Sequence, residues 1–265
     1  MKRMRKGIFA LLFSAMYLGI WAVMNLVVTI GYCIYLELTA SKDVAEIYNM
    51  AISNVYALNV ISSILTVWIY ITIYKIRKIP FNKVVENREV PLLTLGMSAI
   101  CALGSRLLVG VYSSFAENSE LLQKSIEKQE SSIPDVFTGG QALAALLATI
   151  VIAPIVEEIL FRGIIMGELQ KAFRPWAAIL LQTLIFGAAH MFIFQSIFAV
   201  VVGIFLGIIY YKTKSICASI ICHGVFNLSV MITFENLSIM AGAVISLFGI
   251  MLVGISLFYI INTNN

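Results

Sequence analysis

Long apolar stretches alternate with short polar segments along the whole chain. A helix that crosses a lipid bilayer needs about 20 mostly apolar residues. Eight stretches are nearly free of charged residues and approach or exceed that length: 7–36, 50–74, 91–112, 136–156, 175–194, 196–211, 215–234 and 237–261. The pattern predicts an all-α, polytopic membrane protein with about eight transmembrane helices.

The composition supports this prediction. The 265 residues are 60% hydrophobic and 12% charged, whereas soluble domains average roughly 45–50% apolar and about 25% charged residues. This excludes an ordinary soluble globule and an intrinsically disordered chain, and four cysteines are too few for a secreted disulfide scaffold. The net charge of +4 needs no nucleic-acid partner, because basic residues mark the topology of a membrane protein.

The basic residues also predict an orientation. If the N-terminus is cytoplasmic, only Lys42, Lys124 and Lys128 fall in outer loops. Thirteen of the 18 Lys and Arg residues then lie on the inner side: Lys2, Arg3, Arg5, Lys6, Lys75, Arg77, Lys78, Lys83, Arg88, Lys171, Arg174, Lys212 and Lys214. The positive-inside rule therefore predicts that both termini are cytoplasmic. We expect an integral protein of a bacterial cytoplasmic membrane, whose first stretch is retained as a tilted, kinked or projecting span.

Two features of the first half stay open to more than one interpretation. The outer loop 113–135 is rich in helix-forming polar residues and is predicted to form an interfacial helix, with a substrate-gating lid as the alternative. Arg106 lies inside an apolar stretch, where it can extend to the membrane surface, pair with a carboxylate or contact substrate.

Three ionisable residues follow the apolar run that ends at residue 156. Residues i and i+4 share a face of a helix, so Glu158 is expected to pair with Arg162. Glu157 is rotated by roughly 100° and is left to face another helix. Pro154 cannot donate to the carbonyl of Ile150, so we expect the helix to bend there.

Both histidines of the chain lie in apolar stretches. His190 ends the sequence Phe-Gly-Ala-Ala-His, and His223 shares a helical face with Asn227, four residues later. Each histidine alone is typical of a hydrogen-bonded structural residue. Together with the glutamates, they predict one polar cavity within the membrane, built from three spans.

These motifs, Glu157-Glu158-x-x-x-Arg162, Phe186-x-x-x-His190 and His223-x-x-x-Asn227, resemble in their order the CPBP family of intramembrane proteases. This is the CAAX-protease and bacteriocin-processing family, also called Abi. The resemblance implies a protease core over 136–265, with its motifs at 157–227, and an intramembrane active site. It leaves 1–135 as three N-terminal transmembrane helices with the outer loop, and we expect both parts to form one integral membrane domain.

The resemblance also implies roles for the motif residues. Glu157 is the expected general base that activates water, and His190 helps to hold that water. His223 and Asn227 stabilise the oxyanion, while Glu158 and Arg162 support the site electrostatically. The implied substrate is a peptide or membrane protein, such as a prenylated CAAX protein, a bacteriocin leader, a peptide pheromone or a membrane-protein tail.

Several alternatives remain at the level of sequence. A cofactor is not favoured, but Glu157, His190 and His223 have the residue types of a site for one Zn ion. A non-catalytic bacteriocin-immunity or scaffold protein and a proton-coupled transporter are the other functional classes. Other intramembrane proteases are excluded, since the chain has no HExxH or GxSG motif and its only aspartates, Asp43 and Asp135, lie in predicted outer loops.

Overall fold

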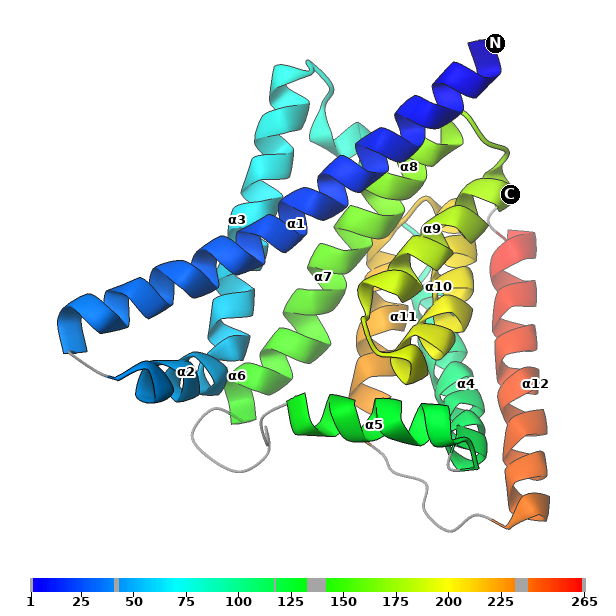
Figure 1. Ribbon diagram of the computed structural model, residues 1–265. Helices are drawn as coiled ribbons and strands as arrows, with labels where there is room; N and C mark the ends of the chain where they lie inside the picture. The colour runs from blue at the N-terminus through cyan, green and yellow to red at the C-terminus, as the bar shows by residue number, and fades with distance from the viewer. Residues whose placement is uncertain (1, 41–42, 117, 133–141, 232–237, 264–265) are drawn as a thin grey trace.

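The protein is built from helices that run up and down a bundle (Figure 1). The computed structural model describes residues 2–40, 43–116, 118–132, 142–231 and 238–263. The helices in its first half are α1 (Lys2–Ala40), α2 (Val44–Ser53), α3 (Val55–Ile76), α4 (Leu92–Ala116) and α5 (Glu120–Ser132). Those in its second half are α6 (Ala142–Leu147), α7 (Ala153–Glu158), α8 (Met166–Gln170), α9 (Pro175–Ala189), α10 (Ile193–Thr213), α11 (Ile216–Ser229) and α12 (Ile239–Thr263).

The prediction of an all-α, polytopic membrane protein is confirmed. Six helical segments of the described chain are long and apolar enough to span a membrane: Arg5–Thr39, Val55–Ile76, Leu92–Ala116, Ala142–Gln170, Ile193–Thr213 and Met240–Thr263. Two further apolar stretches form shorter helices, α9 and α11. The expected number of eight spans is therefore not reached by length alone, because α9 stops at Ala189 and α11 at Ser229.

The long first apolar run forms one oblique helix. At about 1.5 Å per residue, the 39 residues of α1 exceed the roughly 30 Å hydrocarbon core. The helix crosses the bundle diagonally and projects beyond it toward α2 (Figure 1), as the sequence predicts. The start of α1 and the end of α12 lie at the same end of the bundle, while the side of the membrane that this end faces stays a prediction.

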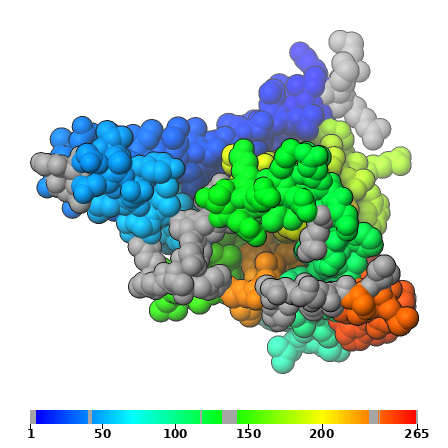
Figure 2. All heavy atoms as spheres, turned by 60° about the horizontal axis from the view of Figure 1, so that its bottom comes forward, coloured from blue at the N-terminus to red at the C-terminus, as the bar shows by residue number. Residues whose placement is uncertain are grey.

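The segment 113–135 contains the predicted helix. Within its described part, α4 ends at Ala116 and α5 follows. Helix α5 lies across the opposite end of the bundle (Figures 1 and 2). The backbone N–H of Phe194, at the start of α10, donates to the hydroxyl of Ser125 at 3.1 Å. This bond ties α5 to the first turn of α10.

Two apolar clusters hold the bundle together. One joins α1 and α3 to α8 and α9 around Tyr17, Tyr70 and Leu169. The other joins α4 to α10, α11 and α12 around Cys101 and Phe226. The predicted boundary between 1–135 and 136–265 lies outside the described residues, and helices from both parts share each cluster.

Candidate functional site

The buried carboxylate of Glu158 is the centre of the polar site. Its Oε1 accepts from Nη1 of Arg162 at 2.6 Å, one turn later on the same helix, as the spacing predicts. The same oxygen lies 2.8 Å from Nδ1 of His223 on α11. Oε2 accepts from the hydroxyl of Ser219. Since both charged side chains are fully buried, these partners replace the water that a buried ion pair loses.

Glu157 faces the other side of the His223 ring. Its Oε2 lies 3.8 Å from Nε2 of His223, and its side chain is 20% exposed, against 0% for Glu158. A carboxylate can only accept a hydrogen bond, so the contact with Glu158 places a proton on Nδ1 of His223. The two consecutive glutamates therefore differ in role: Glu158 orients the imidazole, and Glu157 is the accessible carboxylate beside it.

Phe186 packs between the two histidines. Its ring centroid lies 4.6 Å from that of His190 and 5.9 Å from that of His223, both in edge-to-face geometry. The guanidinium of Arg162 lies 4.4 Å from the same ring centroid, in the range of a cation–π contact. Nδ1 of His190 lies 2.8 Å from the carbonyl oxygen of Phe186, so this nitrogen carries the proton and Nε2 is left as an acceptor.

Asn227 contacts the distorted part of the helix that carries Glu157. Residues Ala148–Ile152 form a π-helical turn, in which the N–H of Ala153 donates to the carbonyl of Ala148. The carbonyl of Thr149 is left without its usual helical donors. The N–H of Ala153 donates to Ala148 instead, and Pro154 has no N–H. The side-chain amide of Asn227 donates to the Thr149 carbonyl at 2.9 Å. The expected disturbance at Pro154 is thus a π-helical turn with a partner on α11.

Gly224 allows this close approach of α11. A Cβ atom built on Gly224 would lie 2.9 Å from the carbonyl oxygen of Ile150. Such a contact is too short for any other residue unless the backbone moves. In a regular α-helix the N–H of residue 154 would donate to this carbonyl of Ile150, but residue 154 is a proline and has no N–H. The glycine therefore sets the spacing between the two helices whose side chains meet at Glu158 and His223.

The structure brings together Glu157, Glu158, Arg162 and His223 by direct contacts, and it joins His190 to them through Phe186. The residues Glu157, His190 and His223 do not form a metal-binding cluster, and no such group of three His, Cys, Asp or Glu side chains occurs among the residues described. The suggested zinc ligands thus do not fit an ion in this arrangement.

From the sequence alone, Ser219 was not singled out, and Phe186 was given only as a motif position without a role. Ser219 precedes His223 by four residues, so the i−4 spacing on one helical face was an available signal. Phe186 is part of a motif, but its contacts with both histidines could not be predicted, because an aromatic residue in an apolar run is typical of any core. Nε of Arg106, one of the residues with an open interpretation, donates to the carbonyl of Ser229 at the end of α11 at 3.0 Å.

Comparisons with known proteins agree with the motif resemblance. Residues 139–229, about a third of the chain, match a family model described as "Type II CAAX prenyl endopeptidase Rce1-like". The chain is also 25% identical over 140 residues to a protein of Bacillus subtilis (strain 168) named "Putative membrane peptidase YdiL". That match covers 52% of this chain and 57% of the relative's length. No solved structure matches the chain.

The matched segment contains every residue of the three motifs, from Glu157 to Asn227. The family match and the similar protein agree with the resemblance to CPBP-family intramembrane proteases, and the apolar helices agree with a membrane protein. Neither comparison identifies the catalytic type or the substrate.

Proposed function

We propose that the protein is an intramembrane endopeptidase that hydrolyses a peptide bond of a membrane-associated substrate, with Glu157 as the general base. The observation that carries this proposal is the asymmetry of the two glutamates. Glu158 is fully buried and engaged by three side chains, whereas Glu157 is partly exposed beside Nε2 of His223. A base must reach its water and still be able to accept a proton.

The proposed reaction begins with a water molecule held by the Glu157 carboxylate. His190 supplies a second acceptor through Nε2. Glu157 removes a proton from this water as its oxygen attacks the carbonyl carbon of the substrate. When the C–N bond breaks, the same proton passes to the leaving amine, so that the carboxylate is regenerated.

His223 and Asn227 are the proposed oxyanion donors. Glu158 orients the imidazole by accepting from Nδ1–H, and His223 donates to the oxyanion in its doubly protonated form, through the N–H at Nε2 on the Glu157 side. Asn227 uses one amide hydrogen for Thr149 and retains a second one for the oxyanion. Donors aimed at a developing negative charge in a water-poor site are worth about 3–4 kcal/mol each.

The family match supports a substrate class as part of this proposal. A CAAX-type prenylated peptide or a leader-type peptide carries its own membrane-associated segment, which delivers the scissile bond to a site between membrane helices. The bilayer is then part of the recognition, and nucleic acid is not expected as a partner.

The experiment compares cells of the source organism that carry the wild-type gene, Glu157→Gln, Glu89→Gln or a deletion. Peptides in the membrane fraction and in the medium are identified by mass spectrometry. We expect a cleavage product to vanish equally in Glu157→Gln and in the deletion, at unchanged protein level, and to persist in the exposed control Glu89→Gln. If Glu157→Gln instead matches the wild type while the deletion differs, the protein acts without this base, as an immunity or scaffold protein does.

A further inference from the structure

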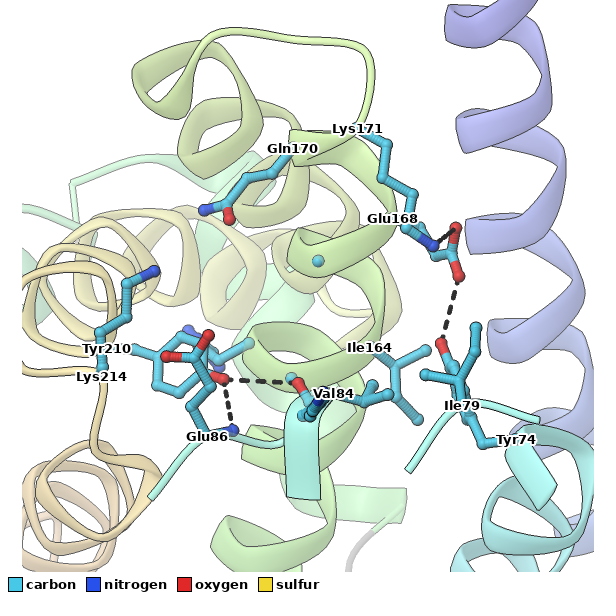
Figure 3. Close-up of a pocket in the computed structure, with 14 residues that line it drawn as sticks. Tyr74, Ile79, Val84, Glu86, Ile164, Glu168, Gln170, Lys171, Tyr210 and Lys214 are labelled. Atoms are coloured by element: carbon cyan, nitrogen blue, oxygen red, sulfur yellow. Dashed lines mark hydrogen bonds and ion pairs between the residues drawn. The ribbon is translucent and has the colours of Figure 1, made fainter. Parts of the chain in front are cut away.

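A second polar pocket lies farther along the helix that carries the two glutamates. It has a volume of about 250 Å³ and is lined by the end of α3, the segment around Val84, the turns from Arg162 to Lys171 and the end of α10 (Figure 3). Of the site residues described above, only Arg162 lines it. The pocket is therefore a neighbour of the site at Glu157 and His223, and Arg162 belongs to both.

The charges around this pocket favour an anion. Glu168 is neutralised by Arg77 at 2.8 Å and by Lys171 at 2.6 Å, and Arg162 is paired with Glu158. The remaining ionic groups of the lining are two cations, Lys83 and Lys214, and one carboxylate, Glu86.

Three polar atoms that belong to residues of the lining point to a ligand. Within the described part of the chain, Nε of Arg162, Nε2 of Gln170 and Oε2 of Glu86 are buried and have no hydrogen-bond partner. A buried polar group without a partner costs about 1–3 kcal/mol, so three of them around one cavity need an explanation. Two are donors and one is an acceptor. A fitting ligand must therefore present acceptor oxygens and a hydrogen-bond donor together.

The side chains face one another in a way that suits such a ligand. Gln170 and Lys214 extend toward each other across the pocket, and the carboxylate of Glu86 lies below them (Figure 3). The other wall is apolar and includes Ile79, Val84 and Ile164. At Gly167, an added Cβ would meet nothing within 4 Å, so the lining is open there.

We propose that this pocket binds the head group of a phospholipid with a protonated amine, of the phosphatidylethanolamine type. The phosphate accepts hydrogen bonds from Gln170 and is attracted by Lys83 and Lys214, while the ammonium donates to Glu86. The apolar wall contacts the beginning of the acyl chains. A lipid is favoured over a soluble phosphate because the pocket belongs to a membrane protein and because basic pockets between membrane helices are typical sites for lipid head groups.

The proposal does not depend on the proteolytic function. It does have a consequence for the neighbouring site, since Arg162 is the residue that both share. A bound phosphate near Nε of Arg162 adds an acceptor to a guanidinium whose Nη1 holds Glu158. We therefore expect lipid occupancy to stabilise the helix segment from Glu158 to Gln170.

The test uses the full-length protein, purified in detergent and stripped of lipid. Binding is measured by native mass spectrometry and by the shift of the thermal unfolding midpoint. The probes are phosphatidylethanolamine and phosphatidylcholine with identical acyl chains, the soluble glycerophosphoethanolamine, inorganic phosphate and a short peptide with a free C-terminal carboxylate. Phosphatidylcholine is the matched lipid control, because it has the same charges but no N–H donor for Glu86.

We expect phosphatidylethanolamine to bind about tenfold more tightly than phosphatidylcholine, because one additional charge-assisted hydrogen bond accounts for a difference in affinity of about that size. Glu86→Gln should reduce this preference to about twofold or less and leave the binding of phosphatidylcholine unchanged. Lys83→Gln and Lys214→Asn should weaken both lipids, whereas Lys75→Ala, an exposed lysine outside the pocket, should change neither. Asparagine is chosen at 214 because this residue has a φ of 52°.

Three results would overturn the proposal. The first is equal binding of the two lipids to the wild type and to Glu86→Gln. The second is stabilisation by inorganic phosphate or by glycerophosphoethanolamine as large as that by the lipid, which identifies a site for soluble anions. The third is binding of the carboxylate peptide, but not of the lipids, in a manner that depends on Lys83 and Lys214, which identifies a peptide subsite. Circular dichroism of each variant without lipid verifies that it is folded.

Discussion

Oε1 of Glu158 lies 2.8 Å from Nδ1 of His223, whereas Glu157, the preceding residue, is 3.8 Å from the opposite ring nitrogen. The imidazole thus lies between two adjacent carboxylates of one helix, with one of them buried and the other accessible. This arrangement gives the two glutamates different sensitivities to substitution.

For the glutamate pair, we predict that substitution of Glu157 mainly affects activity and that substitution of Glu158 also affects stability. Glu157→Gln should abolish turnover and change the free energy of unfolding by less than about 1 kcal/mol, because the side chain is partly exposed. Glu158→Gln should destabilise the protein by about 3–5 kcal/mol, since it leaves the buried guanidinium of Arg162 without its counter-charge. Chemical unfolding in detergent and product analysis by mass spectrometry measure the two effects. Equal loss of stability in both variants would contradict the assignment.

Ser219 is predicted to act as a positioning residue through Glu158. Ser219→Ala removes the hydroxyl donor to Oε2 and should lower kcat several-fold with little change in KM, because the carboxylate that orients His223 loses one of its three partners. We expect a stability loss of about 1 kcal/mol. Ser219→Thr, which keeps a hydroxyl, should restore part of the rate. Ser256→Ala, at an equally buried serine of α12, is the control and should leave kcat unchanged.

The contact between Asn227 and Thr149 predicts an energetic coupling to Pro154. Asn227→Leu should cost about 1–2 kcal/mol of unfolding free energy, since it leaves the Thr149 carbonyl without a donor. Pro154→Ala introduces a backbone N–H that can donate to the Thr149 carbonyl within the helix. In a double-mutant cycle, the cost of Asn227→Leu should therefore fall by about 1 kcal/mol when residue 154 is alanine. Strict additivity of the two substitutions would show that Asn227 does not compensate for the proline.

Gly224 is predicted to be intolerant of any side chain. Gly224→Ala brings a Cβ to within 2.9 Å of the backbone oxygen of Ile150, which cannot move independently of its helix. Separation of the two helices lengthens the contact of His223 with Glu158, so we expect at least a tenfold loss of turnover and a lower unfolding midpoint. Gly242→Ala, whose Cβ meets nothing within 4 Å, should be as stable as the wild type or slightly more stable. An active and stable Gly224→Ala would contradict the tight spacing.

The amino-acid sequence by itself determined the features that depend on one segment of chain. Apolar runs of membrane length predicted helices, because an unpaired backbone polar group in lipid is too costly for other structures. The helical repeat was enough to pair Glu158 with Arg162, and the missing N–H of Pro154 was enough to place a distortion before Glu157. Each of these follows from covalent structure and local periodicity.

The tertiary structure decided how the helices meet. Which glutamate holds His223, the position of Phe186 between the two histidines, and the use of Asn227 on Thr149 all depend on the rotation and spacing of separate helices. The early ends of α9 and α11 were likewise hidden inside continuous apolar runs. Local periodicity contains no information on the register between helices, because that register is set by packing contacts such as the one at Gly224, between residues far apart in sequence.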